Sequence, residues 1–255
     1  MDNKKVIVLI PSRLASTRLP NKPLADINGK TMIEWIYKNV TEKTGYEVAV
    51  AAGDQEIIDT VNAAGGKAIL TDPALPSGSD RIAAALDVID PDGTKYDVVV
   101  NFQGDAINTH PSIITELVEL LEKTDADLTT CGMIMDPKLH NDPSSVKIAM
   151  GLKNGETEGR CLYFSRENVP HDRDGEPGDK YHHIGIYVYK AAALKKFVAC
   201  DKGILETRES LEQLRALENG MTIYAKIVDQ LKMIPEAPAD IDTQEELDEM
   251  RKYLK

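Results

Sequence analysis

The sequence is poor in cysteine and lacks long apolar runs. Its cysteines lie far apart, with an odd total and no C-x-x-C spacing, at Cys131, Cys161 and Cys200. This pattern excludes a disulfide framework and a cysteine-rich zinc site, and it favours isolated buried thiols. The first apolar run, Val6 to Ile10, ends at Pro11 and is too short for a membrane span or a signal peptide. We therefore expect a cytoplasmic protein that does not insert into membranes.

Positive charge is also scarce. Lys and Arg number 30 against 42 Asp and Glu, which gives a formal charge of −12. Nucleic-acid phosphates and anionic lipids repel such a chain, so neither is an expected partner. An anionic substrate would need a local concentration of basic side chains, and that is the feature to look for.

Apolar strands alternate with amphipathic helices through the first half of the chain. Strands are expected at 6–10, 48–52, 67–70 and 97–102, and helices at 31–39, at 55–64 and from Ser79 or Asp80 to Ile89. This alternation predicts an α/β fold with a Rossmann-like, mainly parallel sheet flanked by helices. Ligands bind such sheets beyond the carboxyl ends of the strands, so the loops after residues 10, 70 and 102 are the candidate sites.

The second half mixes strands and helices without a linker or an internal repeat. We expect strands at 128–135, 146–152, 160–164, 183–189 and 222–228, and helices at 112–122, 205–218 and 243–254. The chain, 1–255, is therefore predicted to be a single domain with a smaller mixed β subregion.

The loop after the first strand gathers the cations. Arg13, Arg18 and Lys22 fall within ten residues, and no acid follows until Asp26. Arginine can fork two phosphate oxygens and lysine supplies a point charge, so this loop predicts a polyphosphate site. A solvated basic surface loop is the alternative. The glycine patterns of P-loop proteins and of dinucleotide-binding dehydrogenases are absent, which removes the main support for both classes.

Two further loops carry candidate binding residues. Residues 77–81 (SGSDR) form a small turn through which the backbone can reach a bound ligand, and a plain helix N-cap is the alternative. Residues 101–105 (NFQGD) end a strand with a carboxylate, Asp105, which suits Mg²⁺ together with phosphate oxygens. The amide of Gln103 can hydrogen-bond a ligand in this loop, whereas a turn or cap role is the alternative for Asp105.

The first loop also carries a resemblance. R-x-x-S-T-R-L-P-x-K-P-L, continued by D-I-N-G-K-T-M-I, resembles the opening of the CMP-Kdo synthetases (3-deoxy-manno-octulosonate cytidylyltransferases). The resemblance extends from Val6 to Leu254. It implies a fold of the nucleotide-diphospho-sugar transferase type, a homodimer, and transfer of CMP from CTP to an acidic sugar for lipopolysaccharide biosynthesis. It further implies a nucleotide-binding part at about 1–125, a sugar-binding and dimerisation part at about 126–228, and a C-terminal metal-ligand segment and helix at 229–255.

The family's nucleotide site falls on the three loops. The resemblance assigns nucleotide binding to Pro11, Ser12, Arg13, Arg18, Lys22, Ser77, Gly78, Asp80, Arg81 and Gln103. Asp240-Ile241-Asp242-Thr243 resembles the family's V-D-T-P-E-D-L element, with Gln244 in place of Pro, and so implies Asp242 as a second Mg²⁺ ligand beside Asp105. A helix N-cap is the alternative role for Asp242. The expected catalytic residues are Arg18, Lys22, Asp105 and Asp242.

Three segments of the second half resemble the family's sugar site. They are 163–166 (YFSR), 183–187 (HIGIY) and 205–215 (LETRESLEQLR). The sugar-binding candidates are Gln103, Arg166, His183, Tyr187, Glu206, Glu209 and Gln213. Arg166 is a natural partner for an acceptor carboxylate, and helical spacing places Glu206, Glu209 and Gln213 on one face. A solvated helix face and a structural histidine are the alternatives.

The expected reaction is attack of the sugar's anomeric hydroxyl on the α-phosphorus of CTP, with pyrophosphate leaving in line. Mg²⁺ on the two aspartates would bridge the α-phosphate and the sugar. Arg13, Arg18 and Lys22 would stabilise the departing pyrophosphate.

Two departures from the family's pattern keep other acceptors open. Ala106 stands where the family usually has Glu, and Leu75 stands where it usually has His. The same transfer to a neuraminate-type sugar or a phosphonate is therefore an alternative. A non-catalytic nucleotide-sensing protein on the same fold is the alternative of another class.

Overall fold

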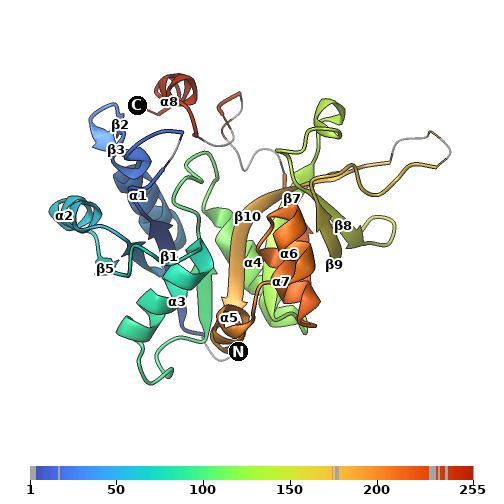
Figure 1. The fold of residues 1–255 in the computed structure, drawn as a ribbon, viewed down its shortest axis with the longest axis horizontal. Helices are drawn as coiled ribbons and strands as arrows, with labels where there is room; N and C mark the ends of the chain where they lie inside the picture. Colours follow the sequence, from blue (N-terminus) through green and yellow to red (C-terminus); the bar gives the residue numbers. More distant parts are fainter. Residues whose placement is uncertain are drawn as a thin grey trace. The chain divides into compact units, whose positions relative to one another are not determined.

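Figure 1 shows the computed structural model, which describes residues 4–16, 18–173, 175, 178–229, 234, 236–238 and 241–254. Contacts divide the chain into two units. The first unit comprises residues 1–114 and 231–255, and the second unit comprises residues 115–230. The two ends of the chain therefore belong to the same unit.

The first unit is built on parallel strands. They are β1 (Val6–Ser12), β4 (Glu47–Ala52), β5 (Ala68–Leu70) and β6 (Val98–Asn101), in the spatial order β5-β4-β1-β6. The predicted parallel pairing in this part of the chain is confirmed. β1 is buried along its whole length, as expected for a central parallel strand. It runs two residues further than predicted, because Pro11 and Ser12 still pair with β4.

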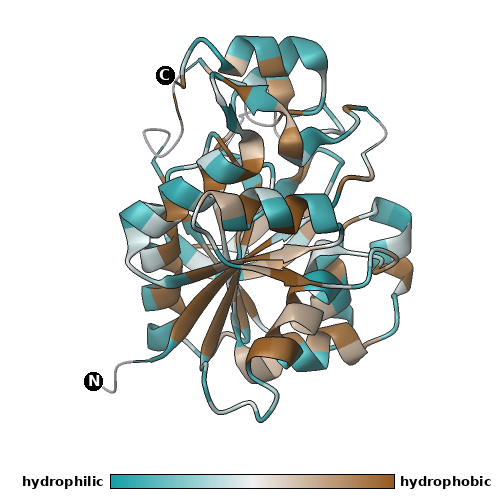
Figure 2. Cartoon of the chain, turned by 90° about the vertical axis from the view of Figure 1, so that its left-hand side faces the viewer, coloured by the Kyte–Doolittle hydropathy of each residue, from teal (hydrophilic) through white to brown (hydrophobic). Residues whose placement is uncertain are grey.

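Helices cover both faces of these strands. They are α1 (Met32–Thr44), α2 (Gln55–Ala63) and α3 (Gly78–Ile89). α1 and α2 contact each other and pack on β4, whereas α3 packs on β1 and β4. Since crossovers between parallel strands are right-handed, the steps from β1 out to β5 put α1 and α2 on one face, and the return to β6 puts α3 on the other. Figure 2 shows the brown, apolar strands between helices whose outer sides are teal.

Capping residues fix where these helices begin. At the start of α1, the Thr31 side chain accepts from the Glu34 backbone N–H, and the Glu34 carboxylate accepts from Thr31 in return. α3 begins earlier than predicted. Its N-cap is Ser77, and not Ser79 or Asp80, because the Ser77 hydroxyl accepts from the Asp80 backbone N–H.

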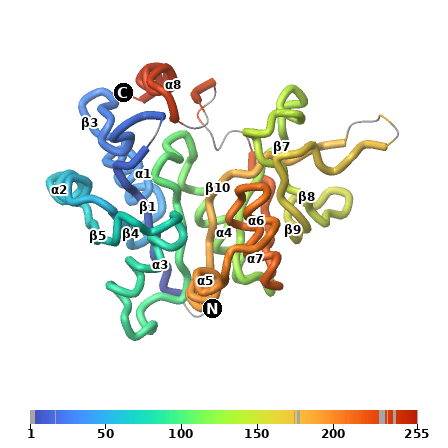
Figure 3. Tube along the Cα trace, in the orientation of Figure 1, coloured from blue at the N-terminus to red at the C-terminus, as the bar shows by residue number. Residues whose placement is uncertain are grey.

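A short hairpin ties the last helix to the N-terminal part of the unit. The elements are β2 (Asp26–Ile27), β3 (Lys30–Thr31) and α8 (Gln244–Met250). Asn28 and Gly29 make the hairpin turn, both with positive φ. The Asn28 amide donates to the backbone carbonyls of Arg251 and Leu254, just beyond α8. Figure 3 shows the red α8 beside the blue β3. Segments from near the two ends of the chain are therefore neighbours within the first unit.

The second unit contains strands of mixed direction. They are β7 (Leu128–Ile134), β8 (Lys147–Gly151), β9 (Glu158–Ser165), β10 (Tyr181–Lys190) and β11 (Ile223–Ile227), in the order β10-β7-β11-β9-β8. β7 and β11 are parallel, and the other pairs are antiparallel. The mixture of strands predicted for the second half is confirmed.

The helices of the second half differ from the prediction at two places. They are α4 (Ser112–Lys123), α5 (Ala191–Ala199), α6 (Ile204–Glu209) and α7 (Gln213–Glu218), with a 3₁₀ turn η2 (Pro137–Leu139). α5 was not predicted. The single helix predicted over 205–218 is wrong, because Ser210 adopts φ 53° and ends α6. Within the described part of the chain, no helix has the length and apolar character needed to cross a membrane.

Candidate active site

Two adjoining pockets open at the carboxyl end of β1. Their volumes are ≈330 Å³ and ≈280 Å³. Both are lined by Pro11, Ser12, Arg13, Gln103 and Asp105. The first pocket also has Arg18, Lys22 and Asp242 in its wall, and the second has Ser77, Gly78 and Arg81. The three loops predicted from the sequence therefore converge, and of the predicted nucleotide-binding residues only Asp80 does not line either pocket.

Lys22 joins the two predicted metal ligands. Its Nζ lies 3.0 Å from Asp105 Oδ2 and 3.0 Å from Asp242 Oδ1, and Arg18 Nη2 lies 2.7 Å from Asp242 Oδ2. Lys22 is nearly buried, whereas the Arg18 side chain is 68% exposed. Burial by itself would lower the pKa of Lys22, but the charge of Asp105 and hydrogen bonds to both carboxylates outweigh it and raise that pKa. Lys22 is therefore charged at physiological pH.

A tight turn points Lys22 at the carboxylates. Lys22 begins the 3₁₀ turn η1 (Lys22–Leu24), which the chain enters through Asn21 at φ 54°. Pro23 fixes the next backbone dihedral, and the Ala25 N–H closes the turn on the Lys22 carbonyl at 3.1 Å. The lysine therefore projects from a stiff backbone and not from a free loop.

Asp242 reaches the pocket from the start of α8. The N-cap of this helix is Thr243, whose hydroxyl accepts from the Glu246 N–H. The Glu246 carboxylate accepts from the backbone N–H groups of Asp242 and Thr243, at 2.7 Å and 2.8 Å. The N-cap role considered for Asp242 thus belongs to Thr243, and the Asp242 carboxylate is directed to Lys22 and Arg18. Asp240 lies outside the described residues.

The two carboxylates fit a divalent cation. Oxygens of Asp105 and Asp242 converge on one positive charge, the Lys22 ammonium. Mg²⁺ is usually coordinated by one or two protein carboxylates, and water and phosphate oxygens complete its coordination shell. Within the described residues, no group of three or more His, Cys, Asp or Glu could hold a metal. The donor set therefore suits a cation that arrives with a nucleotide.

The inner wall of the pockets contains an unpaired hydroxyl. Ser12 Oγ is buried and has no hydrogen-bond partner among the described residues. Burying a hydroxyl without a hydrogen bond costs about 1–3 kcal/mol, so a ligand that hydrogen-bonds Ser12 Oγ would bind more tightly. Opposite, a Cβ at Gly78 would lie 3.3 Å from Pro11 Cγ and 3.6 Å from Gln103 Oε1. A larger residue at position 78 would therefore narrow the pocket.

Ser77 and Asp80 are engaged with each other. The Ser77 hydroxyl donates to Asp80 Oδ2 at 2.7 Å and accepts from the Asp80 N–H at 3.2 Å. The N-cap alternative for this segment is therefore confirmed. It does not exclude nucleotide contact by Ser77, which lines the pocket.

Arg81 holds the loop after β5. Its guanidinium donates to Thr71 Oγ1 at 2.7 Å, to the Asp72 carbonyl at 3.1 Å and to the Pro73 carbonyl at 3.4 Å. Burial, and then repulsion from Arg13, lower the pKa of Arg81. With its donors directed to this loop, Arg81 shapes the pocket wall, and direct contact with a nucleotide stays a prediction.

Gly104 has no room for a side chain. A Cβ there would lie 2.4 Å from the Pro11 carbonyl oxygen, a backbone atom. We expect Gly104→Ala to lower the free energy of unfolding by about 1–3 kcal/mol and to displace Asp105, as denaturant unfolding and initial rates would show. Gly151→Ala is the matched control, because its nearest neighbour would be 3.8 Å away. Equal stability of the two variants would contradict this expectation.

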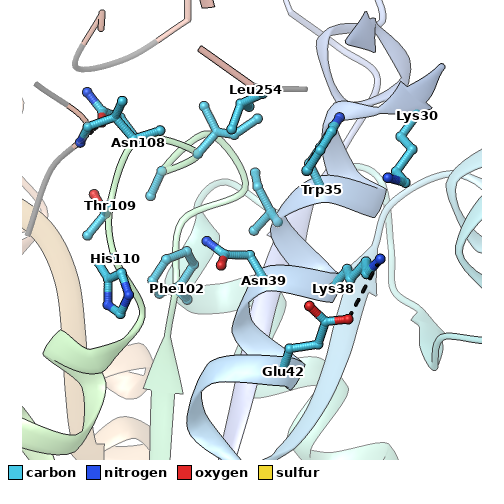
Figure 4. A pocket seen from close by; sticks show the side chains of 14 residues that line it. Lys30, Trp35, Lys38, Asn39, Glu42, Phe102, Asn108, Thr109, His110 and Leu254 are labelled. Carbon is cyan, nitrogen blue, oxygen red and sulfur yellow. Dashed lines mark hydrogen bonds and ion pairs between the residues drawn. The ribbon is translucent and has the colours of Figure 1, made fainter. Parts of the chain in front are cut away.

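A separate cavity lies beside the loop that carries Asp105. It has a volume of ≈390 Å³ and is lined by residues of α1, by residues 106–110, and by Ile234 and Leu254. Figure 4 shows Trp35, Lys38 and Asn39 of α1 across from Asn108, Thr109 and His110. Ala106 lines this cavity, whereas Leu75 lines the ≈280 Å³ pocket. Of the two departures from the family's pattern, only Leu75 therefore borders the candidate site.

In the second unit, Arg166 is fixed by backbone carbonyls. Its Nε donates to Glu209 O at 2.7 Å, its Nη1 to Pro143 O at 2.9 Å and its Nη2 to Ser210 O at 3.4 Å. The Glu209 carboxylate accepts from Ser165 Oγ at 2.8 Å and from the Arg166 N–H at 3.0 Å. Two of the predicted sugar-binding residues, Arg166 and Glu209, therefore lie together.

Glu206 and Gln213 have different surroundings. Glu206 forms a buried two-point ion pair with Arg215, at 2.8 Å and 2.6 Å, which joins α6 to α7. Gln213 is buried, and its Nε2 has no hydrogen-bond partner among the described residues. The expectation that Glu206, Glu209 and Gln213 share one helix face is wrong, because the helix breaks at Ser210.

His183 is a buried, neutral imidazole. Its ring centroid lies 5.1 Å from that of Phe164 and 5.5 Å from that of Tyr187. Its Nε2 lies 3.0 Å from Thr130 Oγ1, which itself donates to the Ile186 carbonyl at 2.8 Å. A hydroxyl has one proton, so when Thr130 donates it to the Ile186 carbonyl, Nε2 is the donor to Thr130 and Nδ1 is an acceptor. Burial, with a smaller effect of His182, lowers the pKa of His183 to about 3.

This pKa predicts a pH-dependent contribution to stability. The unfolded chain binds a proton at His183 near pH 6.5, whereas the folded chain does not until about pH 3. The free energy of unfolding should therefore fall as the pH drops below 6.5, by about 1.4 kcal/mol per unit. The stability advantage of the wild type over His183→Gln should shrink by about 2 kcal/mol between pH 7.5 and pH 5 in denaturant titrations. A constant difference would show that His183 is not kept neutral.

Some residues that support the pocket were not found from the sequence. Asp54 Oδ2 accepts from the Leu14 N–H at 2.8 Å and so anchors the basic loop. Gly53 leaves space for Arg81, since a Cβ there would lie 2.7 Å from Arg81 Nη1. No motif identifies Asp54, whereas Gly104, inside Q-G-D, was a recognisable signal for close backbone approach.

Comparisons with known proteins identify the family of the chain. A family model described as Cytidylyltransferase matches residues 7–223. The 3-deoxy-manno-octulosonate cytidylyltransferase of Rhodospirillum rubrum is 48% identical over 97% of this chain and 95% of its own length. The enzyme of that name from Methylobacterium radiotolerans is 48% identical over 92% of this chain and 94% of its own.

Solved structures show the same likeness. A CMP:2-keto-3-deoxy-manno-octonic acid synthetase complexed with CTP matches with a TM-score of 0.86 and 31% identity, covering 98% of each chain. A cytidylyltransferase from Leptospira borgpetersenii matches with a TM-score of 0.62 at 15% identity, which shows the shared fold alone.

The α/β fold and the matched family model define the protein as a cytidylyltransferase. Two relatives that are nearly half identical over almost the whole chain carry one and the same name. The chain belongs to the CMP-Kdo synthetase (3-deoxy-manno-octulosonate cytidylyltransferase) family, as the resemblance of its first loop predicted.

Proposed function

We propose that this protein transfers CMP from CTP to the anomeric hydroxyl of 3-deoxy-manno-octulosonate and releases pyrophosphate. The observation that carries the proposal is the meeting of Asp105, Asp242 and Lys22 at the carboxyl end of β1. That geometry suits nucleotidyl transfer. Membership of the CMP-Kdo synthetase family identifies the proposed nucleotide as CTP and the proposed acceptor as 3-deoxy-manno-octulosonate.

The nucleotide would lie along the two pockets. The ≈280 Å³ pocket, with Ser12, Gly78 and Gln103, offers backbone and amide groups for the nucleoside. The ≈330 Å³ pocket, with Arg13, Arg18 and Lys22, offers three positive charges for the phosphates. Three cations against two carboxylates leave this pocket positive within a chain of charge −12, which favours a polyphosphate.

Asp105 and Asp242 would hold Mg²⁺ in the complex with CTP. Mg²⁺ bound there would lower the pKa of the attacking hydroxyl and neutralise charge on the α-phosphate. Lys22 would move its charge from the aspartates to the leaving pyrophosphate, and Arg13 and Arg18 would bind the outer phosphates. The stiff turn around Lys22 limits the reorganisation that this exchange of partners requires.

The sugar would bind through residues of the second unit. Arg166 and Glu209 are fixed side by side and supply a cation and a carboxylate to an acidic, hydroxyl-rich acceptor. Gln213 Nε2 is a buried donor in need of an acceptor, and His183 Nδ1 is a neutral acceptor. Tyr187 packs on His183, and Glu206 acts through its ion pair with Arg215. We further infer a homodimer, with residues 126–228 as the sugar-binding and dimerisation part.

A panel of acceptors tests the choice of sugar. With CTP and Mg²⁺, we expect pyrophosphate release with 3-deoxy-manno-octulosonate and much slower release with a neuraminate-type sugar or an alkyl phosphonate. Mass spectrometry of the nucleotide product identifies the acceptor that was used. Preference for another acceptor would overturn the assignment of 3-deoxy-manno-octulosonate as the substrate. CTP binding without turnover of any acceptor would favour a nucleotide-sensing protein instead.

A further inference from the structure

We propose that Asn108 is a positioning residue that sets the distance between Asp105 and Asp242, and thereby the affinity for the divalent cation. The inference rests on the proposed function and concerns the same site. Asn108 follows Asp105 by three residues and is itself buried, with 3% of its surface exposed. It lines the ≈390 Å³ cavity and not the nucleotide pockets.

The Asn108 side chain ties together the two segments that carry the aspartates. Its Nδ2 donates to the Pro238 carbonyl at 2.8 Å and to the Ala237 carbonyl at 3.2 Å. The Ile234 N–H donates back to both Asn108 Oδ1 and the Asn108 backbone carbonyl. One amide therefore uses both its donors and its acceptor on residues 234, 237 and 238, which precede Asp242 in the chain.

The other side of this loop borders a cavity, and residues 106–109 are themselves buried. Residues 106–110 border the ≈390 Å³ cavity on the side facing α1, where Figure 4 shows Asn39 and Trp35 across from Asn108. A loop beside a cavity lacks part of its packing contacts and relies more on hydrogen bonds. The amide of Asn108 supplies three such bonds to the segment before Asp242.

A second tie holds the C-terminal end of α8, the helix that follows Asp242. There Asn28 holds the carbonyls of Arg251 and Leu254. Asp242 is thus placed between one tie to the hairpin and one tie to the Asp105 loop. The Asn108 side chain bonds the Asp105 loop directly to the segment before Asp242, beside the bridge that Lys22 makes between the two carboxylates. When a metal ion displaces Lys22, loss of the Asn108 tie should let the carboxylates separate without unfolding α8.

Asn108→Ala is the direct test, and Asn39→Ala is its matched control. Both asparagines line the same cavity, but the described structure records no side-chain hydrogen bond for Asn39. Mn²⁺ binding in the presence of CTP, followed by electron paramagnetic resonance, should weaken about tenfold in Asn108→Ala and stay unchanged in Asn39→Ala. Hydrogen exchange of the segment 234–248 in the ligand-free protein should accelerate in the first variant only.

The dependence of turnover on Mg²⁺ separates positioning from loss of a stable fold. If Asn108 only sets the geometry, the rate of Asn108→Ala should recover toward the wild-type kcat at high Mg²⁺. Asn108→Leu is a second variant in case Asn108→Ala does not fold: it keeps a similar volume without adding a charge but loses both donors and the acceptor, and it should weaken Mn²⁺ binding similarly. Unchanged Mn²⁺ affinity in both variants would overturn the proposal. Failure of the wild type to turn over CTP and sugar would count against the proposed function, while the exchange and Mn²⁺ measurements would still decide the role of Asn108.

Discussion

Asp105→Ala and Asp242→Ala are each expected to lower kcat by about a thousandfold at saturating CTP and sugar, a loss of about 4 kcal/mol of transition-state stabilisation. The reason is that each aspartate supplies one of the two protein ligands proposed for Mg²⁺. Since each variant leaves Lys22 paired with the remaining carboxylate, both should fold. Initial rates of pyrophosphate release as a function of Mg²⁺ measure the effect.

Two controls accompany this prediction. One separates the charge of the carboxylate from its shape, and the other compares an aspartate of the site with an aspartate of the surface. Asp105→Asn keeps the shape of the side chain but removes its charge, and it should be nearly as slow as Asp105→Ala. Asp59→Ala removes an exposed carboxylate on α2 that lines neither pocket, and it should turn over normally. Wild-type rates in both Asp105→Ala and Asp242→Ala would refute the assignment of the metal site.

Lys22→Met is expected to lower kcat by about a hundredfold to a thousandfold, because the leaving pyrophosphate loses a point charge held in a stiff turn. The same substitution removes the cation that now pairs the two aspartates. Mn²⁺ should therefore bind more tightly to Lys22→Met than to the wild type when CTP is absent. Slower turnover together with tighter metal binding is a combination that a general loss of structure would not produce.

Two variants make this result interpretable. Lys22→Arg keeps the charge but changes its geometry and should retain part of the activity. Lys43→Met removes an exposed lysine in the last turn of α1 and should change neither quantity. Mn²⁺ binding that is equal in the wild type and in Lys22→Met would contradict the competition between the ammonium and the metal.

Local sequence patterns predicted most of the first unit. The strands before the basic loop and before Q-G-D are short apolar runs bounded by charged or turn residues, and their parallel pairing follows from the alternation with helices. Strand boundaries moved by one or two residues, and pairing with β4 extends β1 to Ser12. Helix ends moved further: α1 ends at Thr44 instead of residue 39, and α8 ends at Met250 instead of residue 254. α5 was missed although Leu194 and Phe197 have helical spacing, because it follows β10 directly without a turn signal.

Local sequence patterns predicted less of the candidate site than of the fold. The basic loop and Asp105 could be found from charge and position, since both follow strands of one sheet. Asp242 is far away in sequence, and only the family resemblance paired it with Asp105. The roles of Arg81 and Glu206 depend on partners such as Thr71 and Arg215, which no spacing rule identifies. Helical spacing failed at Ser210 because one residue with positive φ redirects the chain.

The most direct test of the account is the rate of pyrophosphate release by the wild-type protein with CTP, UTP, GTP or ATP, each with and without 3-deoxy-manno-octulosonate and Mg²⁺. The account predicts release only when CTP, the sugar and Mg²⁺ are all present, with loss of release on chelation of the metal. Release that is equally fast without Mg²⁺, or with the other nucleotides, would contradict it.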